Sequence, residues 1–327
     1  MVRRNDSEKG AALVLVLGII AVMSSMAVFS FESLSRLIAL SGAKTHESQS
    51  HHYALGAEML AINVGRQLVR DRMPLQILIS EGKNRFQQNL NGAQLVGELR
   101  DATNCFNLAG LVSGSYAKGW TANMAAVEQF SRLLRAYGLG SQAALAISSA
   151  LADWQDSDAK PLPLGAESDF YADRAPAYQA PNAPMSSVWE MRLVRDVTPQ
   201  LMKQLGDLIC ADAVVLNSLI NINTLSERHA PLLAALLGPT VNENEMRGLI
   251  ADRPKQGFTD MARFWEHPAL AYRDLAGVRK SFFATYPRRL NVMIDVELAG
   301  VKNRMKSDIH FYPNGTYTII SRHFGDM

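Results

Sequence analysis

Residues 8–33 read EKGAALVLVLGIIAVMSSMAVFSFES, and this stretch decides the architecture of the chain. From Ala11 to Phe31 it holds 21 residues without a charged side chain. A helix of about 20 apolar residues crosses the hydrocarbon core of a bilayer, whereas a removable secretory signal has an apolar core of only about 7–15 residues. Residues 25–27 (SMA) have the form of a signal cleavage site, but the apolar run continues past them. We therefore expect a membrane anchor that stays on the protein.

The residues on either side of this run indicate its orientation and its length. Arg3, Arg4 and Lys9 precede it, so we expect the N-terminus in the cytoplasm and the bulk of the chain outside. Residues 32–72 contain no proline, and their apolar side chains recur at spacings near three and four. The same helix is therefore expected to continue out of the bilayer as an amphipathic helix.

The composition sets broad limits on the fold and the partners. A chain of 327 residues suggests two domains, or one domain with a large insertion. The net charge is +2, so no field of one sign points to nucleic acid. Two cysteines exclude a disulfide-built scaffold and leave either one bridge or two buried thiols.

The residues just before the apolar run form a short leader. Lys9-Gly10 followed by AALVL (residues 11–15) resembles the class III signal of type IV pilins and type II secretion pseudopilins. The resemblance implies that a prepilin peptidase cuts between Gly10 and Ala11 and methylates the new amine. Most members have glutamate at the fifth mature position, which is Leu15 here. Its absence is typical of the K-type minor pseudopilins, which are placed at the filament tip.

The remainder of the chain predicts an α+β protein. Residues 289–298, 303–312 and 315–324 are strand candidates, and Pro313-Asn314-Gly315 marks a hairpin between the last two. Short strands and turns are expected over residues 73–111, and helices at 124–137, 142–155, 199–208, 225–237 and 243–251. We predict a pilin-like fold in which the long N-terminal transmembrane helix packs on an antiparallel sheet, with a large inserted α-helical domain. The expected divisions are the leader (1–10), the transmembrane helix (11–31), the helix continuation and first β part (32–112), the inserted domain (113–286) and the C-terminal strands (287–327).

Three further segments carry the same resemblance along the chain. LADWQDSDAKPLPLGAESDFY (151–171), VWEMRLVRDV (188–197) and ININTL (220–225) are similar to segments of the K-type family in the same order. The resemblance implies a single-pass protein of the cell inner membrane with its bulk in the periplasm. The partners it implies are the I- and J-type minor pseudopilins, the major pseudopilin, the prepilin peptidase and the inner-membrane assembly platform.

An acidic loop is the best candidate for a metal site. Asp156, Asp158, Glu167 and Asp169 lie close together in sequence, and proline and glycine fill the interval. Four adjacent carboxylates repel one another unless a cation neutralises them, and Ca²⁺ accepts six to eight oxygen ligands. The spacing excludes an EF-hand, and a solvated acidic loop is the alternative. Because K-type pseudopilins bind calcium in this stretch, the resemblance implies a structural calcium ion. Asp153 and Asp173 are weaker candidates for its ligands.

Cys105 and Cys210 form the one possible intrachain pair. Buried thiols are the usual fate of lone cysteines. A single pair in a domain that faces the oxidising periplasm favours a bridge between them instead. Such a bridge would tie the β region to the inserted helical domain.

Two other functions are weighed and disfavoured. Residues 220–250 resemble the start of a helix-hairpin-helix DNA-binding unit, but Pro239 removes a backbone amide and Glu243 and Glu245 carry the wrong charge for phosphate. Ser115 and Lys118 match S-x-x-K, yet the companion elements of acyltransferases are absent. We expect neither nucleic-acid binding nor enzyme activity. The alternatives to a tip pseudopilin are a minor pilin of a surface type IV pilus and, less favoured, a membrane-tethered periplasmic enzyme.

Overall fold

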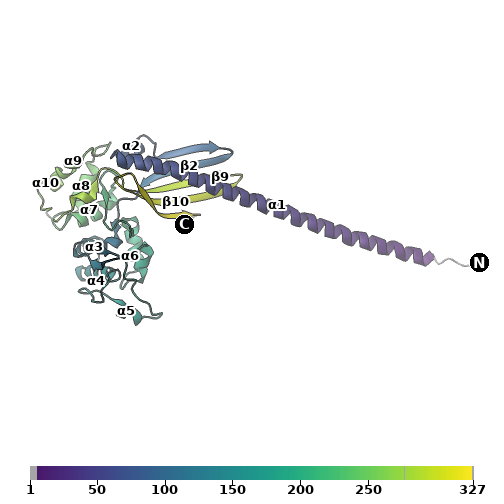
Figure 1. The fold of residues 1–327 in the computed structure, drawn as a ribbon, viewed down its shortest axis with the longest axis horizontal. Coiled ribbons are helices and arrows are strands. Elements are labelled where there is room, and N and C mark those ends of the chain that lie inside the picture. The colour runs from purple at the N-terminus through teal and green to yellow at the C-terminus, as the bar shows by residue number, and fades with distance from the viewer. Residues whose placement is uncertain (1–5, 276, 326–327) are drawn as a thin grey trace, which may run out of the picture.

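A single helix dominates the computed structural model, which describes residues 6–275 and 277–325. Helix α1 (Asp6–Arg70) has 65 residues and, at about 1.5 Å per residue, reaches about 100 Å. It begins at Asp6 rather than at the predicted Ala11, because residues 6–10 are helical as well. Figure 1 shows its N-terminal half projecting away from the rest of the molecule. Every large apolar side chain from Leu13 to Leu40 is exposed there, and this helix has the length and composition to cross a membrane.

The C-terminal half of α1 packs on a sheet. Its buried apolar side chains recur at helical spacing and are Ala54, Ala57, Ala61, Ile62, Leu68 and Val69. Gly65 lets the sheet approach closely, because a Cβ there would lie 2.4 Å from Cζ of Phe311. Glu58 is buried in the same contact and forms an ion pair with Arg322 and a hydrogen bond with Ser307.

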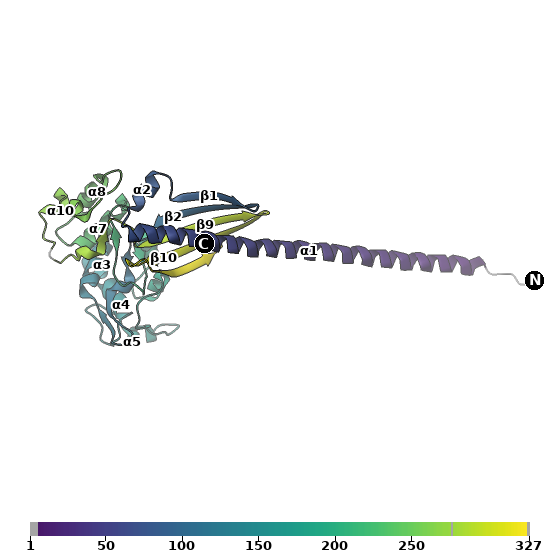
Figure 2. The same cartoon turned by 45° about the horizontal axis from the view of Figure 1, so that its top comes forward.

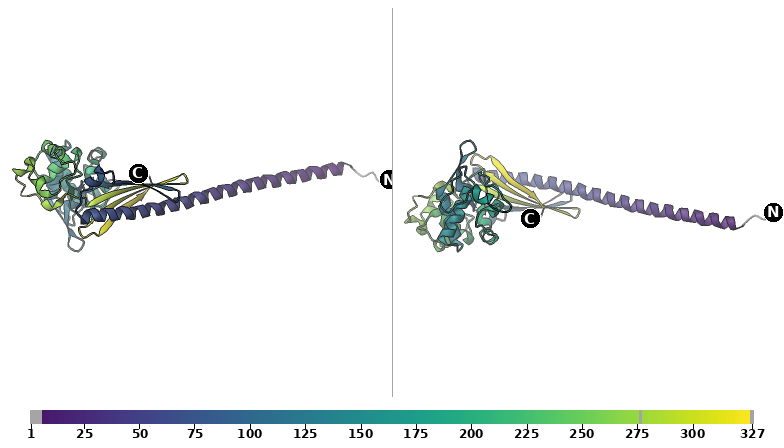
Figure 3. Two further views of the ribbon diagram at one scale, coloured as in Figure 1. Left: turned by 90° about the horizontal axis from the view of Figure 1, so that it is seen from above. Right: turned by 90° about the horizontal axis from the view of Figure 1, so that it is seen from below.

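The sheet has five antiparallel strands in the order β1-β2-β9-β10-β11. These are β1 (Arg85–Leu90), β2 (Ala93–Asp101), β9 (Arg289–Leu298), β10 (Val301–Phe311) and β11 (Tyr317–Phe324). Alternate residues of β2 and β9 are buried, as a sheet with one covered face requires. The turns Asn91-Gly92 and Ala299-Gly300 have positive φ at both residues, which suits two-residue hairpins. Figures 2 and 3 show α1 running along one face of this sheet.

A helical head is inserted between β2 and β9. We call residues 106–284 the head, and α1, α2 (Leu75–Ser80) and the five-stranded sheet the body. The helices of the head are α3 (Met124–Ala136), α4 (Ser141–Asp153), α5 (Ser168–Ala172), α6 (Pro199–Leu205), α7 (Ala230–Leu237), α8 (Glu243–Ala251), α9 (Met261–Trp265) and α10 (Pro268–Ala271). Its 3-10 turns are η1 (Leu108–Leu111), η2 (Val188–Leu193), η3 (Gly206–Leu208), η4 (Glu227–His229) and η5 (Lys280–Phe282).

Short strand pairs complete the head. β3 (Phe106–Asn107) pairs in parallel with β6 (Ile209–Cys210), and β7 (Ile220–Asn221) pairs in parallel with β8 (Phe283–Ala284). β4 (Val112–Ser115) and β5 (Gly119–Ala122) form an antiparallel hairpin.

Head and body have separate hydrophobic cores. One cluster of buried residues lies within the head, between Phe106 and Phe283, and the other is built by α1, α2 and the sheet. The two clusters share no residue. In Figure 1 the head lies at the end of the sheet that is far from the N-terminus.

The predicted fold class is confirmed, and most predicted elements are found. The three C-terminal strands and the helices predicted at 124–137, 142–155, 199–208 and 243–251 are present. The helix predicted at 225–237 begins only at Ala230, because residues 227–229 form the 3-10 turn η4. Residues 75–80 form α2, where short strands and turns were predicted, so that prediction is wrong. The helix predicted to reach Leu208 ends at Leu205, because Gly206 takes a positive φ of 53° and the chain tightens into η3.

Candidate functional site

Three of the four predicted metal ligands come together at the end of α4. The ligand oxygens of Asp156, Asp158 and Glu167 all lie within 4.8 Å of one another. Asp156 lies three residues beyond the last residue of α4, and Glu167 is the N-cap residue of α5. Asp156 and Glu167 are buried and Asp158 is exposed, so the cluster opens to solvent on one side.

No Lys, Arg or His of the described residues forms an ion pair with the carboxylates of this cluster, which lie close enough to repel one another. Burial, reinforced by the neighbouring carboxylates, raises the pKa of Asp156 to about 7. Burial and the negative charge of Asp153 raise the pKa of Glu167 to about 7. Asp156 Oδ1 and Glu167 Oε1 are buried without a hydrogen-bond partner. Buried polar atoms normally find partners, so this donor set fits a hard cation such as Ca²⁺, which prefers oxygen ligands.

Asp169 lies outside the cluster, so the structure does not support its place in the predicted ligand set. It is exposed in the first turn of α5. It follows Glu167 by two residues, and side chains two positions apart on a helix do not face each other. Asp173, the C-cap residue of α5, is also exposed and lies outside the cluster.

The carboxylate of Asp153 binds the backbone of the acidic loop and is not part of the cluster of Asp156, Asp158 and Glu167. Its carboxylate is fully buried and accepts the N–H of Leu162 at 3.1 Å. Burial raises its pKa to about 6, although the N–H groups of Leu162 and Ala166 act against this rise. A Cβ on Gly165 would lie 1.9 Å from Asp153 Oδ2, so only glycine allows the loop to pass this carboxylate.

Contacts that the sequence did not reveal fix the loop on the head. The N–H of Ser157 donates to the carbonyl of Trp120, and the N–H of Trp120 donates to Ser157 Oγ at 2.8 Å. The guanidinium of Arg195 donates to the carbonyls of Leu164 and Gly165. It also lies over the ring of Phe170, 5.3 Å from the centroid. The position of Arg195 in the predicted family segment 188–197 was the only sequence signal for this role.

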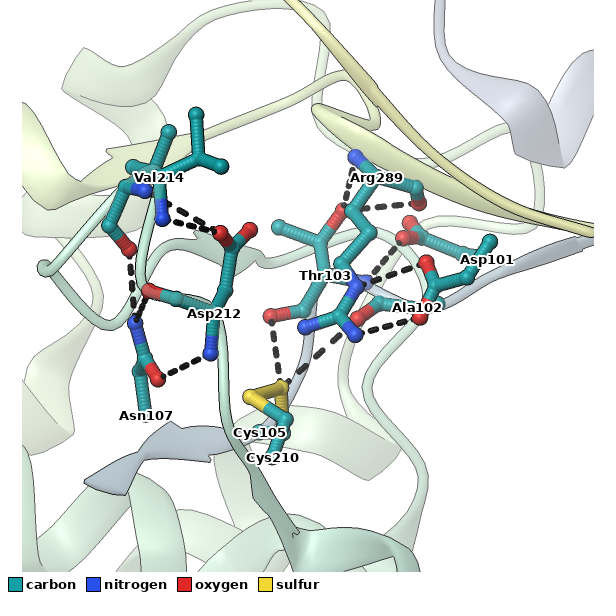
Figure 4. A network of polar contacts seen from close by, with 11 residues as sticks. Asp101, Ala102, Thr103, Cys105, Asn107, Cys210, Asp212, Val214 and Arg289 are labelled. Atoms are coloured by element: carbon teal, nitrogen blue, oxygen red, sulfur yellow. Dashed lines mark hydrogen bonds and ion pairs between the residues drawn. A yellow bond between two sulfur atoms is a disulfide. The ribbon is translucent and has the colours of Figure 1, made fainter. Parts of the chain in front are cut away.

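The two cysteines form a disulfide at the root of the head. Cys105 and Cys210 are bonded, and their Cα atoms are 5.7 Å apart. Cys105 precedes β3 and Cys210 ends β6, so the bridge fastens this parallel pair. Figure 4 shows the bridge below Thr103, where the chain enters the head from the sheet.

Other candidate residues take structural positions. Ser115 and Lys118 close the turn of the β4–β5 hairpin through a backbone hydrogen bond, and Lys118 is exposed. Gly10 and Ala11 lie within the helical backbone of α1, while leader residues 1–5 lie outside the described residues. Leu15 is 64% exposed on the free half of α1.

Comparison with known proteins identifies the family. A family model described as type II secretion system (T2SS), protein K matches residues 104–213, and a second with the same description matches residues 220–285. A Klebsiella pneumoniae protein named type II secretion system protein K is 30% identical over 325 residues, 98% of each chain. The chain belongs to the type II secretion system protein K family.

Further comparisons agree with this membership of the protein K family. The protein K of Pectobacterium carotovorum subsp. carotovorum is 32% identical over 259 residues, 78% of each chain. The crystal structure of the GspK-GspI-GspJ complex from enterotoxigenic Escherichia coli contains a chain with a TM-score of 0.72 and 24% identity. This match covers 88% of the present chain and 99% of that chain, and it shows the same fold. The family decides between the two filament alternatives in favour of type II secretion over a surface pilus.

Proposed function

We propose that this chain is the minor pseudopilin at the tip of the type II secretion pseudopilus, where it initiates or caps the filament. Its partners in that role are I- and J-type minor pseudopilins. The solved complex that shares its fold contains three proteins named GspK, GspI and GspJ, which supports this choice of partners. The observation that carries the proposal is the free half of α1, which is exposed and apolar and has Leu15 in place of a carboxylate. The large head lies at the opposite end of the molecule.

The helix supplies the assembly surface. After a prepilin peptidase cuts between Gly10 and Ala11, the new amine is a positive charge inside the membrane. Pairing reduces the cost of such a charge, and in ordinary pilins a glutamate of the neighbouring subunit provides the partner. A chain with Leu15 offers no carboxylate to a neighbour, so it does not join an existing filament in the ordinary way. That restriction suits the first subunit, and the head lies at the far end of the sheet, where a tip subunit has nothing above it.

A role at the filament tip also implies the remaining partners of the chain and its location in the cell. The free half of α1 would hold the chain in the cell inner membrane, with the sheet and head in the periplasm. The assembly platform and the major pseudopilin would then build the filament beneath it and export folded periplasmic proteins. In this role the chain acts by assembly and catalyses no reaction.

The acidic cluster serves this function as a structural calcium site. Asp156, Asp158 and Glu167 would provide the charged ligands, and the ion would brace the long loop between α4 and η2. The buried, unpartnered oxygens of Asp156 and Glu167 support this proposal. Isothermal calorimetry on detergent-solubilised full chain tests it, and no heat of calcium binding would contradict it.

The assembly proposal is tested by processing and co-isolation. A tagged full chain is expressed in cells that lack their own protein K, and membranes are analysed for N-terminal mass and for bound I- and J-type proteins. Gly10→Val is expected to keep Met1 and to lose both partners and secretion. Gly56→Val is the matched control, because a Cβ there meets nothing within 4 Å and the position lies outside both the cut and the free half of α1. A processed wild-type chain that never co-isolates with the I- and J-type proteins would contradict the proposal.

A further inference from the structure

The junction between head and body is polar, although each part has its own apolar core. The two hydrophobic clusters share no residue. The chain passes between the parts only twice, at residues 101–105 and 285–289. Units joined by short connections and a polar interface usually move relative to one another. A fixed orientation of the head therefore needs specific contacts at the junction.

The two crossing segments are bonded to each other. The N–H of Ala102 donates to the carbonyl of Arg289 at 3.0 Å. The hydroxyl of Thr103 accepts the N–H groups of Arg288 and Arg289 at 3.1 and 3.2 Å. The two segments therefore act as one hinge rather than as two separate supports.

One carboxylate of the body reaches across this hinge. Asp101 is the last residue of β2 and lies opposite Leu290 of β9, so its backbone belongs to the sheet. Its Oδ2 accepts the side-chain amide of Asn221 at 2.5 Å and the hydroxyl of Thr224 at 2.6 Å. Its Oδ1 accepts the N–H of Thr103 at 2.8 Å. Both donor groups of the head belong to the ININTL segment (220–225).

That segment is rigidly fixed within the head. The amide of Asn223 is fully buried, donates to the carbonyls of Phe258 and Thr285 at 2.9 Å, and accepts the N–H of Phe258 at 2.6 Å. Asn104 adds a second link, since it accepts the N–H of Asn221 and donates to Thr224 Oγ1. The bonds of Asp101 therefore connect one rigid unit to another.

A buried carboxylate of the head lies on the other side of the hinge. Figure 4 shows Asp212 on one side of Thr103 and Asp101 on the other. The buried carboxylate of Asp212 accepts the N–H groups of Val214 and Val215 and acts electrostatically on Arg289 and His310 of the sheet. Arg289 is held in turn by Asp308 of β10.

We propose that Asp101, through Asn221 and Thr224, is a latch that holds the head at a fixed angle to α1 and so lets an axial push on the helix reach the head. The latch follows from the geometry alone, whereas its use in transmitting a push rests on the proposed function. Without it, the hinge at residues 101–105 and 285–289 would absorb the push by bending.

The angle is measured by pulsed electron resonance on the full chain in nanodiscs. Spin labels are attached through ketone-bearing amino acids at exposed Leu60 on α1 and Tyr272 on the head, which leaves the disulfide intact. Asp101→Ala is expected to broaden the distance distribution. Glu98→Ala on the same strand is the matched control, because Glu98 pairs with Arg85 and Arg100 within the sheet, and it is expected to leave the distribution narrow.

A gentler variant keeps the test decisive if Asp101→Ala does not fold. Thr224→Val keeps the shape of the side chain and removes the hydroxyl, so it is expected to broaden the distribution in the same direction but less. Distributions as narrow as wild type in the folded variants would overturn the latch.

A secretion assay separates the latch from the function it serves. Asp101→Ala is expected to lose secretion while it still co-isolates with the I- and J-type proteins. Full secretion by a variant with a broadened distribution would overturn the role in transmitting force. If the wild-type chain does not co-isolate with the I- and J-type proteins, the proposed function is refuted. The measured distance distributions would still test the latch.

Discussion

Replacing Asp156 with asparagine should stabilise the metal-free protein and abolish its response to calcium. The carboxylate of Asp156 is 2% exposed, and one of its oxygens has no hydrogen-bond partner. Its pKa rises from 3.8 to about 7, and a shift of about three units corresponds to a ceiling of about 4 kcal/mol for ionising the group. Solvent reaches the cluster beside exposed Asp158, and screening lowers this to about 2 kcal/mol. Asparagine removes that cost, because it carries no charge.

The assay is thermal unfolding of the solubilised full chain at pH 8, followed by circular dichroism. In chelator, Asp156→Asn is expected to raise Tm by about 5 °C for a cooperative unit of this size. In calcium, wild type gains stability and the variant does not, because it lacks a charged ligand. Asp173→Asn is the control, since Asp173 is exposed and lies outside the cluster. A variant that is less stable than wild type in chelator would refute the reasoning, because the carboxylate would then have a favourable partner.

The same carboxylates predict how the stability of the metal-free protein changes with pH. The pKa values of Asp156 and Glu167 are raised in the folded protein to about 7, against about 4 in the unfolded chain. The folded state therefore binds more protons over this window, and its stability falls as pH rises through it. In chelator, Tm should be higher at pH 5 than at pH 8. Calcium should raise Tm at pH 8 and have little effect at pH 5, where protons compete for the ligands.

Three further changes test the packing, each by denaturant unfolding of the variant beside wild type. Cys105→Ser opens a covalent loop between residues 105 positions apart and should cost about 4–5 kcal/mol; a reducing agent should weaken wild type and spare the variant. Gly165→Ala places a Cβ against Asp153 and should cost about 1–3 kcal/mol, whereas Gly56→Ala on open helix surface should be neutral or stabilising. Glu58→Ala removes the partner of Arg322 and of buried Ser307; because Arg322 is 33% exposed and stays solvated, the loss should be about 1–3 kcal/mol, and an equal loss in Glu47→Ala, at an exposed position, would contradict this.

Local patterns were sufficient to predict the regular parts of the fold. The uncharged run from Ala11 to Phe31 predicts the free half of α1, and the strand candidates 289–298 and 303–312 match the bounds of β9 and, to within two residues, those of β10. The segment 75–80 was misjudged because LQILIS has only six residues, four of them apolar, and so short a run does not distinguish a helix from a strand by its periodicity.

The candidate metal site could be predicted from the sequence only in part. Sequence proximity indicated that the acidic residues lie together, but it could not tell that Asp169 turns away at the start of α5. The loop contacts of Arg195 and the junction contacts of Asp101 join residues far apart in sequence. No local pattern encodes such contacts, because they depend on how the head closes on the sheet.

The insertion of the head between β2 and β9 also sets an order of folding. Leu95 of β2 pairs with Val296 of β9, so the central ladder of the sheet brings together residues about 200 positions apart. When the chain emerges in order from its N-terminus, the apolar faces of α1 and the β1–β2 hairpin stay exposed until β9 pairs with β2. Folding of the head favours this pairing, because a compact head brings its two ends together and lowers the entropy cost of closing the loop. Completion of the sheet therefore depends on prior folding of the head.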